Sequence, residues 1–335
     1  MRQQLVEVIA CAKQSGIRRR QSGELLQIQL RRIQRWELRQ KASGSMDYGK
    51  PGPRQVLHGI MPAERERLLD FAAQAQTVDY SFQVLAIKGA EQGLFFMSAS
   101  SVRVILHEQG LGDDRRGHRR RGSNRKPARP EDITAPNQCW CWDISYLKTD
   151  IRGVFWFLYV MLDEWSRKVI AWRISRSLSR QEALGLIDDA ILEENLLEVP
   201  QDKLPVVVND RGSQMKAKEV QQMFKDLGLT QTFSRPRTPN DNPYVESLLS
   251  TVKTAPAYPE WFPHEDASVV TGYFERYFHW YNHEHYHSRI GYVTPLQKHT
   301  GQAEKIIEER KKQLTAQRQH RIQYWLSQQL TGYGL

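Results

Sequence analysis

The sequence predicts an α/β protein in which a mixed-sheet domain follows two small helical domains. In the front third, apolar residues recur at helical spacing, which favours short helices. From residue 139 to 174, three apolar and aromatic runs are separated by short turns, as expected of three consecutive strands. From residue 179 onward, helical and strand-like segments alternate. The front of the chain is therefore expected to be all-helical and the back to contain the sheet.

Composition sets the expected domain limits. Residues 41–60 are rich in Gly, Ser and Pro, which is typical of a linker. Residues 112–130 are rich in arginine with almost no apolar residue, so they have nothing to bury and cannot fold alone. The expected segments are a first helical domain (1–45), a linker (46–60), a second helical domain (61–110), a basic linker (111–136), the mixed-sheet domain (137–300) and a C-terminal helix (301–335).

The first helical domain contains a basic helix pair. After a helix that Gly16 ends, Leu25 and Leu26 close a short helix, and Ile33 and Trp36 anchor the next. This arrangement resembles a helix-turn-helix, although Gln27 stands where the turn often has glycine. The second helix of such a motif enters the major groove of DNA, and the alternative is a solvated basic helix pair. The residues expected to face DNA are Arg31, Arg32 and Arg35.

The second helical domain opens at Pro62, continues with helices near Leu85 and after Ser98 or Ser100, and also resembles a helix-turn-helix or winged variant. This domain either contacts a groove of DNA or only supports the neighbouring domains, and the sequence does not decide between these two roles. The basic linker that follows is expected to track DNA phosphates or lie in the minor groove. Its arginines include Arg119, Arg120 and Arg121.

Charge and hydropathy narrow the class of protein. Residues 1–130 hold 24 Lys and Arg against 12 Asp and Glu, whereas the remaining residues hold 24 against 26. A basic front half suggests a polyanionic partner, with nucleic acid ahead of a membrane surface. The longest apolar run, residues 154–162, is too short to span a bilayer, and three cysteines form no disulfide framework. We therefore expect a soluble, cytoplasmic protein with no membrane partner.

The mixed-sheet domain is predicted element by element. Strands over 139–147, 154–162 and 169–174 form an antiparallel meander, and a helix capped by Ser179 follows. A strand ending at Asp210, a helix near 217–227, a strand near 229–233 and a helix that begins near Asn242 complete the alternation. Beyond it we expect a helix over 266–283 packed through its aromatic residues, and a charged helix over 303–330. The expected docking stripe of that last helix comprises Ile306, Ile307, Ile322, Trp325 and Leu326.

Three acidic residues occupy informative positions in this domain. Asp143 lies on the first strand, Asp210 ends a later strand, and Glu246 lies in the first turn of a helix for which Asn242 is the expected N-cap. This distribution can bring three carboxylates together at the edge of one sheet. Between Asp210 and Glu246 lie 35 residues, and Lys253 follows Glu246 by seven.

With this spacing, residues 137–300 resemble the catalytic core of the DDE transposases and retroviral-type integrases, in particular bacterial insertion-sequence transposases. The likeness includes the segments 163–172, 233–243 and 280–282, together with His287 and Thr294-Pro295. The resemblance implies a ribonuclease H-like fold, which agrees with the predicted β-β-β-α-β-α-β-α order. Relatives often have His-Ser before the second aspartate, whereas this chain has Val208-Asn209; neither position is a metal ligand in the family.

The resemblance also implies a chemistry and its partners. Asp143, Asp210 and Glu246 would be the catalytic residues and would hold two Mg²⁺ ions, which Mn²⁺ could replace, with Asp143 bridging them. Water would attack in cleavage and the freed 3′-hydroxyl in joining, while Lys253 would contact DNA. The implied partners are double-stranded DNA, as element terminal repeats and as target, and a homo-oligomer that is at least a dimer on DNA. The implied location is a bacterial cytoplasm, in association with the nucleoid.

Several alternatives stay open at this stage. The expected function is that of a DNA transposase, and the alternatives are a metal-dependent nuclease of the same fold and a domesticated DNA-binding protein with an idle core. Cys139 and Cys141 are too closely spaced for zinc, so buried core cysteines are favoured. The histidines from His279 to His287 are expected to pack or to contact phosphate rather than to bind a metal.

Overall fold

The computed structural model describes residues 2–43, 56–111, 133–209, 218–233 and 242–332. The chain divides into two compact units, residues 1–59 and residues 60–335. None of the helices within the described ranges is both long and apolar enough to cross a membrane.

Over residues 2–43 the first unit contains three helices, α1 (Arg2–Gln14), α2 (Arg19–Leu25) and α3 (Leu30–Ser43). The turn between α2 and α3 forms at the predicted place although Gln27 is not glycine, because Gln27 itself takes a left-handed conformation with φ of 54°. A glycine is required elsewhere: a Cβ at Gly23 would lie 2.8 Å from the carbonyl oxygen of Ile28. Ile33 and Trp36 are buried, as predicted.

The second unit begins with a helical bundle of α4 (Pro62–Ala72), a 3₁₀ turn η1 (Ala75–Thr77), α5 (Phe82–Glu91) and α6 (Ala99–Glu108). Ser98, one of the two predicted caps, is the N-cap of α6 and accepts a hydrogen bond of 3.2 Å from the backbone N–H of Ser101. The bundle has a core of its own, built from aliphatic and aromatic side chains of all three helices and of the α5–α6 loop. Its buried members include Leu68, Phe71, Leu85, Phe95, Val102 and Leu106.

The sheet contains five strands in the order β3-β2-β1-β4-β5. Antiparallel pairing joins β1 to β2 and β2 to β3, whereas parallel pairing joins β1 to β4 and β4 to β5. This mixed sheet confirms the predicted antiparallel meander, and the elements follow the predicted β-β-β-α-β-α-β-α order of a ribonuclease H-like fold. The strands are β1 (Cys139–Lys148), β2 (Phe155–Asp163), β3 (Val169–Ser175), β4 (Val206–Asn209) and β5 (Thr230–Phe233).

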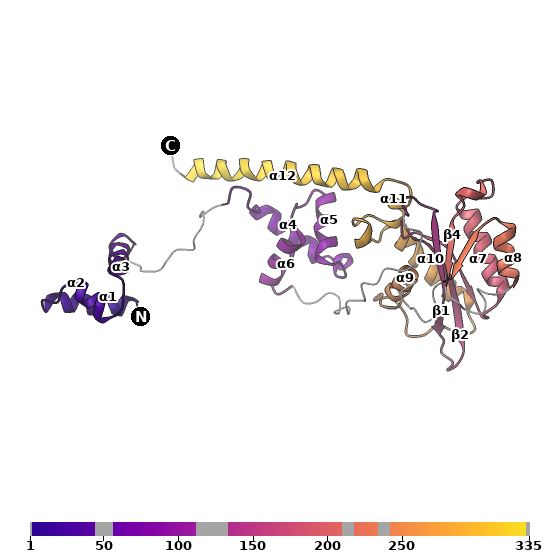
Figure 1. Cartoon of the computed structure of the whole chain (residues 1–335), viewed down its shortest axis with the longest axis horizontal. Helices are drawn as coiled ribbons and strands as arrows, with labels where there is room; N and C mark the ends of the chain where they lie inside the picture. Colours follow the sequence, from indigo (N-terminus) through magenta and orange to yellow (C-terminus); the bar gives the residue numbers. More distant parts are fainter. Residues whose placement is uncertain (1, 44–55, 112–132, 210–217, 234–241, 333–335) are drawn as a thin grey trace. The chain divides into compact units, whose positions relative to one another are not determined.

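Helices cover both faces of the sheet, with α7 and α8 on one side and α9 and α10 on the other (Figure 1). The period-2 alternation of β1 divides its side chains between the two layers. Trp140 and Trp142 pack with α7 and α8, whereas Cys139 and Cys141 pack with α9 and α10. The helices are α7 (Arg180–Glu193), α8 (Lys218–Asp226), α9 (Pro243–Lys253) and α10 (Ala267–His283), and a 3₁₀ turn η2 (Gln201–Lys203) precedes β4.

The end of α10 is held to the sheet by the side chain of Asn282, which bonds to the backbone of β3 as a neighbouring strand would. Asn282 accepts a hydrogen bond from the backbone N–H of Val169 and donates one to its carbonyl oxygen, each of 2.9 Å. This contact gives a physical role to the Trp-Tyr-Asn segment of the sequence. The predicted burial of the α10 aromatics holds for Phe274 and Tyr281 but is wrong for Trp280, which is 38% exposed because it faces outward against His285.

Three further elements complete the second unit, namely η4 (Ser288–Ile290), α11 (Pro295–His299) and the long α12 (Ala303–Gly332). The predicted docking stripe of α12 is partly wrong, since Leu326 is 43% exposed. Charged contacts also hold α12 to the helical bundle: Arg310 pairs with Glu91 at 2.6 Å and Arg321 pairs with Glu64 at 2.8 Å.

Candidate active site

Two of the three predicted acids lie on neighbouring elements on the same side of the sheet. Asp143 is a half-buried residue in the middle of β1, and its Oδ1 accepts a hydrogen bond of 2.8 Å from the backbone N–H of Ile144. Glu246 is exposed in the first turn of α9, which packs on β1. Because Asp143 has the same strand parity as Cys139 and Cys141, it belongs to the face that α9 covers.

Asn242 fastens the start of α9 beside Asp143. It occupies the N-cap position, as predicted, but its side chain makes no capping hydrogen bond. Its Nδ2 instead donates a hydrogen bond of 3.1 Å to the carbonyl oxygen of Trp142, and the residue is 5% exposed. The amide therefore connects the turn that carries Glu246 to the strand position next to Asp143, which the capping prediction did not foresee.

Replacing Asn242 by alanine is expected to slow the strand joining that the family resemblance implies about tenfold, because the lost hydrogen bond is worth about 1–2 kcal/mol and α9 would lose its fixed position on β1. Binding of DNA should change little. Joining rates and binding constants measured on the same preparation test this. Thr254→Ala, at the far end of α9, removes a hydroxyl that bonds only within the helix and serves as the control. Equal rates for both variants would contradict a positioning role.

The third acid, Asp210, lies outside the described residues. The residues before it are described: β4 ends at Asn209, and Val208 packs on the α9 side of the sheet. In the parallel pairing of β1 with β4, Cys141 is opposite Val208. Cys141 precedes Asp143 by two residues, and Val208 precedes Asp210 by two.

The predicted DNA-contacting residues fall in three places. Lys253 is exposed at the C-terminal end of α9. Arg31, Arg32 and Arg35 are exposed on α3, with the Arg32 guanidinium 6.0 Å from the centre of the Trp36 ring. The remaining three, Arg119, Arg120 and Arg121, lie outside the described residues.

The cysteines and histidines considered as alternative metal ligands pack against other side chains. Cys139 and Cys141 are fully buried in the core, as predicted. The ring of His285 stacks on Tyr281 with ring centres 5.2 Å apart, and His279 stacks on His283. Within the described ranges, no three His, Cys, Asp or Glu side chains are grouped as metal ligands.

A buried ionic cluster, which the sequence did not predict, braces the start of β1. Glu194 accepts hydrogen bonds from Asn137 (2.7 Å), Lys168 (2.6 Å) and His299 (2.8 Å). Burial alone would raise the pKa of Glu194, but hydrogen bonds from His299, Lys168 and Asn137 outweigh it and lower the pKa to about 2. Burial would lower the pKa of His299, yet Asp163 and Glu194 raise it to about 9.

These shifts predict how stability depends on pH. The raised pKa of His299 stabilises the fold fully below about pH 6.5, and this contribution is lost as pH rises through about 9. The lowered pKa of Glu194 contributes above about pH 4.5 and is lost as pH falls through about 2. Because the two groups share one contact, we expect a loss on the order of 2–3 kcal/mol between pH 6 and pH 9.5. Urea unfolding of the wild type and of His299→Gln at pH 6 and at pH 9.5 measures this loss of stability. An equally large loss in the variant would show that His299 is not its cause.

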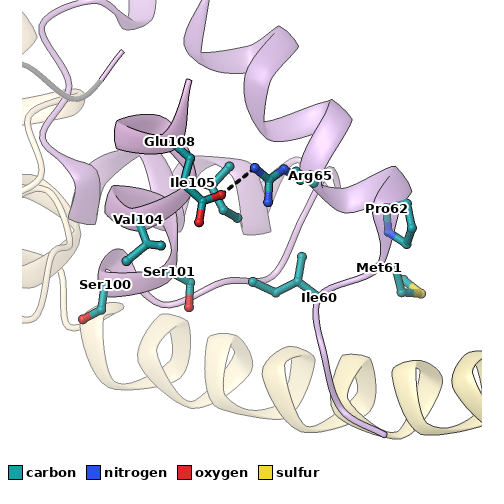
Figure 2. A pocket seen from close by; sticks show the side chains of 9 residues that line it. All are labelled: Ile60, Met61, Pro62, Arg65, Ser100, Ser101, Val104, Ile105 and Glu108. Carbon is teal, nitrogen blue, oxygen red and sulfur yellow. Dashed lines mark hydrogen bonds and ion pairs between the residues drawn. The ribbon is translucent and has the colours of Figure 1, made fainter. Parts of the chain in front are cut away.

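The helical bundle contains a separate groove between α4 and α6, lined by Ile60, Pro62, Val104 and Ile105 among others (Figure 2). Its volume is about 530 Å³, and an ion pair of 2.6 Å between Arg65 and Glu108 crosses one wall. Its described lining includes neither Asp143 nor Glu246, both of which lie in the sheet domain.

Comparisons with known proteins agree with this location. The model of the integrase core domain family matches residues 133–239, and a second integrase core domain model matches residues 227–295. A solved catalytic core domain of the HTLV-2 integrase, in complex with magnesium, has a TM-score of 0.36 and 17% identity, and the match covers 49% of this chain and 97% of that one. Because a TM-score this low does not establish a common fold, the fold assignment rests on strand order and pairing.

Two curated relatives extend the likeness beyond the core. The transposase for insertion sequence element IS904 of Lactococcus lactis is 30% identical over 205 residues, which cover 58% of this chain and 77% of the relative. The putative transposase for IS986/IS6110 of Mycobacterium tuberculosis is 26% identical over 208 residues, which cover 59% of this chain and 73% of the relative. The chain therefore belongs to the family of insertion-sequence transposases that carry an integrase-type core.

Proposed function

We propose that this protein is a DNA transposase that cleaves element ends and joins their 3′-hydroxyls to target DNA, with Asp143, Asp210 and Glu246 as its catalytic residues. The observation that carries the proposal is the tie between Asn242 and Trp142. It holds the first turn of α9, and with it Glu246, against the strand position next to Asp143. The pairing of Cys141 with Val208, each two residues before one of the aspartates, supports Asp210 as the third member.

The donor set fits two Mg²⁺ ions, with Mn²⁺ as a substitute. Magnesium prefers hard oxygen ligands and takes few of them from protein, which suits two aspartates and one glutamate. We propose that Asp143, Asp210 and Glu246 together would hold these ions. Bound there, the metal would neutralise charge at the scissile phosphate and activate the attacking oxygen.

The protein's own residues would position the reacting groups. The rigid pairing of β1 with β2 and β4 fixes Asp143, whereas Asn242 fixes the helix turn of Glu246. Lys253, two helical turns beyond Glu246, would contact a DNA phosphate beside the scissile bond. In cleavage a water attacks phosphorus and the bond to the 3′ oxygen breaks, so that this oxygen leaves as a 3′-hydroxyl with the proton that the water loses. In joining, the freed 3′-hydroxyl attacks a target phosphorus, the target's own bond between phosphorus and its 3′ oxygen breaks, and a target 3′-hydroxyl is released.

The partners follow from this activity. We propose that Arg31, Arg32 and Arg35 on α3 read the terminal repeats in the major groove, and that the basic linker, with Arg119, Arg120 and Arg121, follows phosphates. Two element ends must meet for joining, so we propose a homo-oligomer, at least a dimer, that assembles on DNA in a bacterial cytoplasm.

A strand-transfer assay tests the function directly. Purified protein, Mg²⁺, labelled DNA with the terminal repeats and a plasmid target should give joined products, and Asp210→Asn should remove them while DNA binding persists. Cleavage without joining would favour a metal-dependent nuclease. Specific binding with neither reaction would indicate a DNA-binding protein with an idle core.

A further inference from the structure

A polar pocket lies on α9, next to the candidate active site. It has a volume of about 420 Å³ and lies between α9, the turn after β2 and the segment after α10. Ser247, which directly follows Glu246, and Thr251 contribute one wall, while Arg167, His287 and Arg289 contribute the other. The lining residues that the structure describes include no carboxylate, so the pocket is suited to an anion.

The Arg167 guanidinium is fixed in the pocket wall by its neighbours. It lies 3.5 Å from the centre of the Tyr244 ring and donates a hydrogen bond to the carbonyl oxygen of Glu164. Such stacking fixes the guanidinium without neutralising its charge. Among the described residues, no carboxylate forms an ion pair with Arg167 or Arg289.

The pKa of His287 reflects the positive electrostatic potential of this pocket. Burial lowers its pKa, and the nearby charges of Arg167 and Arg289 lower it further, to about 4. The imidazole is therefore neutral at physiological pH, and its Nδ1 accepts a hydrogen bond of 3.2 Å from the backbone N–H of Arg289. A bound anion would offset the two guanidinium charges.

We propose that the pocket formed by Arg167, Arg289 and the Ser247 face of α9 binds a phosphate of the DNA backbone. This inference rests on the proposed function, because DNA is the polyanion expected beside Glu246 and Lys253. Planar guanidinium groups match the geometry of phosphate oxygens, and the serine hydroxyl supplies a further donor. The volume leaves room for the sugar next to the phosphate. The contact would hold the backbone along α9 and carry no base specificity.

The first test is DNA binding by the full chain carrying Arg289→Gln. Arg289 is exposed, so the variant should fold. Fluorescence anisotropy with a terminal-repeat duplex in EDTA should show binding weakened about fivefold to tenfold, with the slope of log K against log salt reduced by about 1. A duplex of unrelated sequence should lose affinity by the same factor.

Arg152→Gln is the matched control. Arg152 is an exposed arginine in the β1–β2 turn, at the opposite end of that strand pair from Arg167. Equal weakening in both variants would mean that only net charge matters and would overturn the pocket. Unchanged binding by Arg289→Gln would also overturn it, even if joining depends on the acids, so failure of the pocket is distinct from failure of the proposed function.

The second test follows the imidazole of His287 by NMR, with His287→Asn to assign its signal. The duplex should raise the pKa of His287 above about 4, because a phosphate offsets the arginine charges. Inorganic phosphate should cause a smaller shift at higher concentration. A shift with inorganic phosphate and none with duplex would show that the pocket takes free phosphate and would exclude the DNA backbone.

Discussion

Glu246→Gln is expected to reduce strand joining by about a thousandfold while DNA binding and the fold persist. The substitution keeps the size of the side chain but removes its negative charge. That charge is proposed to hold Mg²⁺ beside the scissile phosphate. Losing one such electrostatic contribution in a preorganised site costs about 2.7–4 kcal/mol of transition-state stabilisation. Glu246 is exposed and contributes little to the core, so thermal unfolding should be unchanged within about 0.5 kcal/mol.

Glu275→Gln is the matched control, since Glu275 is an exposed glutamate on the neighbouring helix α10. Joining at the wild-type rate is expected. The double variant Asp143→Asn with Glu246→Gln should be no slower than the slower single variant, because residues that act as one unit are not additive. A double variant slower by the product of the two single effects would indicate that the carboxylates act independently, against a shared metal site.

Regular periodicity made the sheet domain predictable from the sequence. Each strand of the meander was expected within a residue or two of its observed limits, because apolar runs bounded by turn residues identify buried strands. The positions of Asp143 and Glu246 on β1 and α9 followed from the same patterns. Local rules were sufficient there because the alternation and the bounding turn residues lie within each segment itself.

Contacts between residues distant in sequence could not be predicted in this way. Asn242 is a residue type typical of helix N-caps. Only the structure shows that its side-chain amide donates a hydrogen bond to the carbonyl oxygen of Trp142, 100 residues earlier. Glu194 and His299 are separated by 105 residues and form one buried pair. Arg167 and Arg289 come to one pocket from different segments. In each case the contact depends on one polar residue, and an isolated residue forms no sequence pattern from which its partner could be predicted.

Glu64 shows the same limit and connects two distant helices. At the start of α4 it has the sequence signature of a local helix cap, and it does accept a hydrogen bond of 3.1 Å from the backbone N–H of Met61. Its oxygens also accept hydrogen bonds from the backbone N–H of Phe96 (3.2 Å) and from Arg321 of α12 (2.8 Å). Burial would raise the pKa of Glu64, but Arg321 and these backbone donors lower it below its usual value.

Glu64→Ala is therefore expected to destabilise the helical bundle and its contact with α12 by about 3–5 kcal/mol. Glu64 is 1% exposed, and its removal leaves the largely buried Arg321 without a counter-charge and the donors of Met61 and Phe96 unpaired. Hydrogen exchange should quicken in α4 and α12 while the sheet core stays protected. Glu66→Ala, exposed on the same helix, should change stability by less than about 0.5 kcal/mol. If both variants unfold alike, neither the ion pair with Arg321 nor the hydrogen bond to Met61 contributes measurably to stability, and the bundle and α12 are not joined through Glu64.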